Sequence, residues 1–105
     1  MSQAEPQVVI GSPGHIQVSA PMTFQTARRL CAAGIECFKR DGSAVMVVDC
    51  AAVERADSAG LAVLIEWRRW AHHAGRHLKF ANLPVQISAI AHLSEVSAVL
   101  ADAVA

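Results

Sequence analysis

Polar side chains that could bind a ligand or take a modification are concentrated at the start of one predicted helix, at Asp57-Ser58-Ala59-Gly60. An aspartate at this position caps the free backbone N–H groups of a helix's first turn. The same N–H groups lie at the positive end of the helix dipole and favour a phosphate, which a modified Ser58 would carry. Capping alone accounts for both residues and is the favoured interpretation, and phosphorylation of Ser58 is the alternative.

Other candidate sites are weaker. His72, His73 and His77 are close in sequence, but residues 72 and 73 point about 100° apart on a helix, and zinc needs convergent ligands. No histidine is placed by the sequence to activate Ser58. Gly11-Ser12-Pro13-Gly14 lacks the lysine and the following helix of a phosphate-binding loop and predicts a hairpin turn. We therefore expect no catalytic residues, no metal and no cofactor.

The composition is that of one folded domain over residues 1–105, in which we expect residues 1–6 to be disordered. Of the 105 residues, 53% are hydrophobic and 17% are charged, whereas a disordered chain has low hydrophobicity and a high net charge. Nine basic and nine acidic side chains give a formal net charge of zero. This balance argues against nucleic acid as a partner, and it leaves a weak homodimer open because copies repel each other little.

The cysteines and the N-terminal residues favour a reducing, cytoplasmic compartment. Cys31, Cys37 and Cys50 are odd in number, and no two have the Cys-x-x-Cys spacing of a redox or metal site. The first residues lack the positive region of a signal peptide. No apolar run approaches the ~18 residues that span a bilayer, so we expect any membrane association to be indirect, through a partner.

Hydrophobic periodicity predicts an α/β domain in the order β-β-α-β-α-β-α, with helices packed against a mixed sheet of about four strands. Strands are expected at Gln7–Ile10, His15–Ser19, Ala44–Cys50 and His77–Ala81, an initial hairpin and then parallel strands. The nearly unbroken apolar run of the third strand predicts a central strand covered on both faces. Helices are expected at Phe24–Lys39 after a Thr23 cap, at Ser58–Ala74, from Asn82 to about His92, and over Val96–Val104.

A helical wheel of Ser58–Ala74 separates apolar from polar residues well, with the exception of Ile65. Its sheet-facing side gathers Gly60, Val63, Leu64, Trp67, Ala71 and Ala74. Its opposite side carries Ser58, Ala62, Ile65 and Arg69, and Leu61 lies at the border. Ile65 is either an ordinary exposed apolar residue or part of a docking patch with Ser58, Ala62 and Leu61. The wheel leaves both interpretations open.

Two sequence segments resemble those of a known family. Val48-Asp49-Cys50, followed by Val53 and then by Asp57 to Leu61, is similar to the central signature of STAS domains. This family includes anti-sigma-factor antagonists, the cytoplasmic tails of sulfate transporters and MlaB-type subunits of a phospholipid ABC transporter. The segments Gly60–Trp67 and Leu78–Pro84 are most similar to the MlaB type, and the likeness is good from about Ala44 to Val96.

The resemblance implies a STAS-like, non-catalytic docking subunit. Its expected partner is the ATPase of an inner-membrane phospholipid-transport ABC system, which would hold the chain at the membrane periphery. The surface would be formed by Ser58, Ala59, Leu61, Ala62, Ile65 and Arg69, with Asp49 and Asp57 orienting the loop. The alternative is an anti-sigma-factor antagonist whose binding is controlled when a partner kinase phosphorylates Ser58. Ala59 departs from the Ser-Ser pair common in antagonists and lowers the expectation of such a switch.

Overall fold

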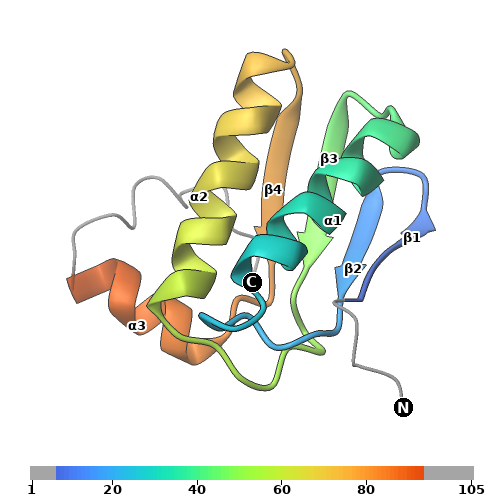
Figure 1. Cartoon of the computed structure of the whole chain (residues 1–105). Coiled ribbons are helices and arrows are strands. Elements are labelled where there is room, and N and C mark those ends of the chain that lie inside the picture. Colours follow the sequence, from blue (N-terminus) through green and yellow to red (C-terminus); the bar gives the residue numbers. More distant parts are fainter. Residues whose placement is uncertain (1–6, 94–105) are drawn as a thin grey trace.

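A computed structural model describes residues 7–93, with side chains up to Ile90. It contains four strands, β1 (Val8–Ser12), β2 (His15–Val18), β3 (Val45–Asp49) and β4 (His77–Ala81). The helices are α1 (Ala27–Asp41), α2 (Ser58–His73) and α3 (Val85–Leu93) (Figure 1). This is the predicted order of elements. The expected disorder of residues 1–6 and the expected helix over Val96–Val104 lie outside the described residues.

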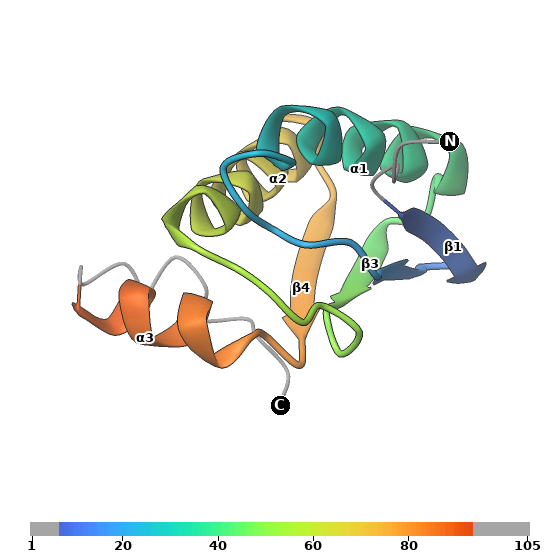
Figure 2. The same cartoon turned by 60° about the horizontal axis from the view of Figure 1, so that its bottom comes forward.

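The four strands form one mixed sheet in the order β1-β2-β3-β4, as predicted. β1 and β2 are an antiparallel hairpin, and β2, β3 and β4 are parallel. Each parallel pair is joined by a helix, so α1 and α2 lie on the same side of the sheet (Figure 2). α3 packs against α2 near the carboxyl ends of the parallel strands (Figures 1 and 2).

Only one face of the central strand β3 is buried, which corrects the expectation that both faces are covered. Met46 and Val48 point toward the helices and are fully buried, whereas Val45 and Val47 point to the other face and are not. The apolar run therefore hides a strict alternation of inward and outward side chains. Valine is favoured at the outward positions because it suits the pleated backbone even where it is partly exposed.

Two helices begin three residues later than the sequence predicts. The hydroxyl of Thr26 accepts a hydrogen bond from the Thr23 N–H at 3.0 Å and donates to the Pro21 carbonyl at 2.6 Å, which closes a turn before α1. Phe24, expected on the apolar side of this helix, instead lies in that turn and is 82% exposed. α3 begins at Val85 because Asn82 has a left-handed backbone (φ 56°), which no helix continues through.

The core between the sheet and the helices depends on a close contact between α1 and α2. The indole N–H of Trp67 donates to the Cys31 carbonyl at 3.0 Å, and the ring meets Phe38 edge to face with centroids 5.5 Å apart. Gly34 lies directly under that ring, where a Cβ would overlap the indole atoms. All of these side chains are buried or partly buried, so the indole has little room to move.

We expect Gly34→Ala to lower the free energy of unfolding by about 1–3 kcal/mol, the usual cost of overpacking a core. Alanine is favoured over glycine in a helix by up to about 1 kcal/mol, so an increase in stability would contradict the predicted clash. Gly11→Ala is the matched control, because its Cβ would lie 3.4 Å from the flexible Gln17 side chain. Urea denaturation of both variants and the wild type measures the difference.

Candidate functional site

The start of α2 is fixed by Asp57, which confirms the predicted cap and adds a second contact. One carboxylate oxygen of Asp57 accepts the Ala59 N–H at 2.8 Å, which is the helix cap. The other accepts the Phe24 N–H at 3.1 Å. Asp57 therefore ties the first turn of α2 to the turn that precedes α1. This bond could not be predicted from local sequence signals, because the two residues are 33 positions apart.

The loop before Asp57 is paired with the segment before α1. The Met22 N–H donates to the Arg55 carbonyl at 2.8 Å, and the Asp57 N–H donates to the Met22 carbonyl at 3.0 Å. Gly60 lies against this segment, since a Cβ there would be 2.5 Å from the Met22 carbonyl oxygen. A glycine is needed at this point of α2 because the two backbones approach closely.

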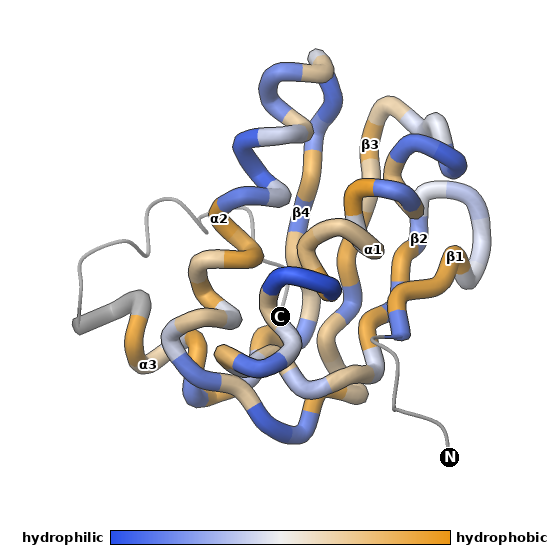
Figure 3. Tube along the Cα trace, viewed as in Figure 1, coloured by the Kyte–Doolittle hydropathy of each residue, from blue (hydrophilic) through white to orange (hydrophobic). Residues whose placement is uncertain are grey.

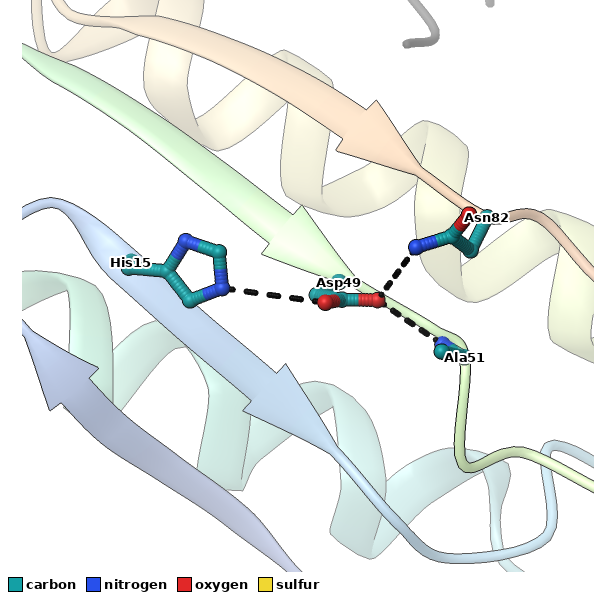
Figure 4. A network of polar contacts seen from close by, with 4 residues as sticks. All are labelled: His15, Asp49, Ala51 and Asn82. Carbon is teal, nitrogen blue, oxygen red and sulfur yellow. Dashed lines mark hydrogen bonds and ion pairs between the residues drawn. The ribbon is translucent and has the colours of Figure 1, made fainter. Parts of the chain in front are cut away.

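Asp49, the last residue of β3, contacts side chains from both neighbouring strands: His15, the first residue of β2, and Asn82, which directly follows β4 (Figure 4). One carboxylate oxygen accepts the Ala51 N–H at 2.9 Å and the Asn82 side-chain N–H at 3.0 Å, and the other lies 3.7 Å from His15 Nε2. The hydrogen bonds from Asn82 and Ala51 lower the pKa of Asp49 below its ordinary value. His15, for which the sequence indicates no role, thus lies beside Asp49.

The surface expected to bind a partner is only partly exposed. Ser58, Ala62 and Arg69 are exposed, and the Arg69 guanidinium lies 3.1 Å from the Glu66 carboxylate. Ala59 is partly buried. Ile65, placed on the outer side by the helical wheel, is also partly buried and packs against the core.

Two residues of α2 lie opposite to their expected positions. Leu61, named for the partner surface, is 7% exposed and belongs to the core. Ala74, expected to face the sheet, is the C-cap of α2 and is exposed. The wheel places Leu61 at the border of the helix, and contacts from elements distant in sequence decide its side.

An apolar groove that the sequence analysis did not identify runs between α1 and α2. Its volume is about 490 Å³, and it is lined by Ala27, Arg28, Cys31, Ala32, Ile35, Ala59, Ala62, Val63 and Glu66. The alanines at Ala27, Ala59 and Ala62 are the one sequence signal for it, because small side chains leave space between two helices. Phe24 lies in the turn that precedes Ala27 and is not among the residues that line the groove.

The described residues contain no group of three histidine, cysteine or acidic side chains that could hold a metal ion. His72 and His73 are exposed at the end of α2, with ring centroids 6.1 Å apart. Within residues 7–93, no helix is long and apolar enough to cross a membrane.

We expect Asp49→Ala to lower the free energy of unfolding by about 1–2 kcal/mol at pH 7, because it removes the acceptor of two hydrogen bonds. A carboxylate whose pKa is lower in the folded state stabilises the fold above its unfolded pKa of about 3.9. That contribution is lost as the pH falls through the folded pKa. The difference between wild type and variant should therefore shrink between about pH 5 and pH 2 in urea titrations.

The exposed acid Glu54, on the loop after β3, supplies the control for this pH dependence. Glu54→Ala should change the stability by no more than about 0.5 kcal/mol at pH 7. A stability difference for Asp49→Ala that stays constant over the whole pH range would rule out the carboxylate as its source.

Comparison with known proteins identifies the fold and the family. The chain covers 79% of a putative anti-sigma factor antagonist from Thermotoga maritima, with 12% identity over 89% of this chain and a TM-score of 0.66. A solved structure of SLC26A9 matches 85% of this chain with 14% identity and a TM-score of 0.68, and the chain spans 17% of that protein's length. At such identities these likenesses show the fold alone.

The family assignment rests on a separate comparison. No curated protein sequence matches the chain. A family model described as "Mlab, STAS domain" matches residues 10–101, which is most of the chain. The chain therefore belongs to the STAS domain family, in its MlaB-type group.

Proposed function

We propose that this chain is a non-catalytic docking subunit that binds the ATPase of an inner-membrane phospholipid-transport ABC system. STAS domains generally mediate protein–protein interactions. The single observation that carries the more specific proposal is the match of residues 10–101 to the MlaB-type family. The chain would then lie at the cytoplasmic side of the membrane through its partner and would tune the ATPase's assembly or turnover.

The exposed surface around the start of α2 supports a docking role. Ser58 and Ala62 are exposed on a helix whose first half is apolar, and the Phe24 backbone is held near Ser58 because its N–H is bonded to Asp57. In Figure 3 the first half of α2 is largely coloured as hydrophobic and the second half as hydrophilic. Large exposed aromatic side chains next to small apolar ones are typical of protein interfaces.

The docking surface is therefore proposed as Phe24, Ser58, Ala59 and Ala62, with Arg69 at its polar edge. Leu61 is excluded because its side chain is buried, and Ile65 contributes only the part of its side chain that remains accessible. Asp49 and Asp57 are proposed to hold the surrounding loops in shape through the hydrogen bonds described above.

We expect Ala62→Arg to weaken binding to the purified ATPase subunit at least about tenfold, since a charged side chain would be buried at the centre of the contact. Isothermal titration calorimetry gives the affinity, and circular dichroism checks that the variant is folded. Ala74→Arg is the matched control, because Ala74 is also an exposed alanine and lies at the opposite end of α2. Equal affinity of both variants and the wild type would refute this surface.

The second candidate is an anti-sigma-factor antagonist that is switched by phosphorylation of Ser58. Its support is the exposure of Ser58 at the N-terminal end of α2. A phosphate there would meet backbone N–H groups but would also lie next to the Asp57 carboxylate, which already occupies the Ala59 N–H.

Ser58→Ala and Ser58→Asp separate the two candidates. A phosphorylation switch predicts that the two variants differ at least about tenfold in affinity for an anti-sigma-factor kinase, and that the wild type gains the mass of one phosphate when incubated with that kinase and ATP. A docking subunit of the transporter predicts neither. Absence of phosphate incorporation would exclude the switch.

A further inference from the structure

We propose that the groove between α1 and α2 binds an amphipathic α-helix of the partner protein, antiparallel to α1 and α2. The proposal deepens the docking function and rests on it, because Ala59 and Ala62 belong to both the groove and the docking surface. It adds α1, which is not part of the docking surface proposed above.

The shape of the groove suits a helix. Its lining residues on α1 run from Ala27 to Ile35, a rise of about 12 Å or a little over two helical turns. α1 and α2 begin at the same end, and four of the nine residues that line the groove are alanines, so a third helix could approach closely at those positions. Helices bind such grooves through apolar side chains at positions i, i+3 or i+4, and i+7.

The depth of the groove follows from the α1–α2 contact beneath it. The Trp67 indole fills the space between the helices at the level of Gly34 and is bonded to the Cys31 carbonyl. One to two helical turns closer to the N-termini of α1 and α2, the residues that line the groove include the small side chains of Ala27, Ala59 and Ala62. The wide part of the groove therefore lies at the end where both helices begin and where Phe24 is exposed.

Charge gives the direction of the bound helix. Neither α1 nor α2 has an acidic residue in its first turn, and the Asp57 cap is bonded to two N–H groups. The N-terminus of α1 and the exposed Arg28 make this end of the groove positive, whereas the Asp57 carboxylate offsets the dipole of α2. Glu66 lines the other end, where its carboxylate lies 3.1 Å from the Arg69 guanidinium, so the direction is set by the Arg28 end. A partner helix is complementary when its negative C-terminal end lies at Arg28, which requires the antiparallel direction.

The charges also favour a helix over a lipid tail as the occupant. Arg28 is exposed at one end of the groove, and the hydrocarbon of an acyl chain carries no group that pairs with a guanidinium. A helix carries polar groups at both ends and apolar side chains between them, which matches a groove that is charged at its ends and apolar along its length.

The first test separates α1 from the rest of the docking surface. Ala32 lines the groove from α1, is exposed, and is not part of the surface proposed above. We expect Ala32→Arg to weaken binding of the ATPase subunit at least about tenfold in calorimetry, whereas Ala74→Arg should bind as the wild type does. Binding that is lost in Ala62→Arg but kept in Ala32→Arg would overturn the groove proposal and leave the docking function standing. An ATPase subunit that fails to bind the wild type would refute the docking function itself.

The second test reports the occupant and its direction. A photoreactive amino acid replaces Arg28 in one variant and Glu66 in another, and the cross-linked partner residues are identified by mass spectrometry. Both should lie on one partner helix, with the residue linked from position 28 nearer its C-terminus. The reverse order, or links to separate segments, would overturn the proposal. Groove-dependent binding of phosphatidylglycerol vesicles that is lost in Ala32→Arg would also overturn it and would indicate a lipid site.

Discussion

The two hydrogen bonds of the Asp57 carboxylate are the contact on which the candidate site depends. One bond caps α2, and the other holds the N–H of Phe24 in the turn before α1. Because a single side chain serves both, the beginnings of the two helices are fixed next to each other. The positive ends of their dipoles then point to the same place on the surface, and Phe24 is presented beside Ser58.

The close spacing of α1 and α2 determines the packing on both sides of their contact, toward the sheet and toward the outer surface. Toward the sheet, the absence of a side chain at Gly34 lets the Trp67 indole enter between the helices and join the core. On the outer side, four of the nine residues that line the groove are alanines, whose small side chains leave space between the helices. The same pair of helices thus produces a dense core and an open apolar groove, and the difference arises from the size of a few side chains.

The element order, the mixed sheet and the α2 cap could be predicted because each depends on local signals. Asp57 before an apolar helical pattern and glycine after it define α2 within one residue at each end. The side chains that were misplaced depend on pairings distant in the sequence. Leu61 and Ile65 are covered by packing that a helical wheel does not include, and Phe24 is expelled from α1 by a turn that the Thr26 hydroxyl closes.

The groove could not be predicted from the sequence for a related reason. The groove is formed by two helices together. The hydrophobic pattern of α1 or of α2 alone does not predict it. The exposed alanines Ala32 and Ala62 are individually unremarkable on a helix surface, and only their placement along one interval gives them a role. By contrast, Asp49 could be placed in its loop, because a carboxylate at the end of a buried strand must find partners nearby.

Asp57 and Ser58 have different roles, which explains how Ser58 could be modified or bound by a partner without destabilising the fold. Asp57 supplies the cap and the link to Phe24, and both are bonds that the folded chain needs. Ser58 is the next residue, exposed, and the cap bond to Ala59 comes from Asp57 and not from its hydroxyl. A partner contact or a modification at Ser58 would therefore act on what approaches the surface, while the carboxylate beside it keeps the two helices in place.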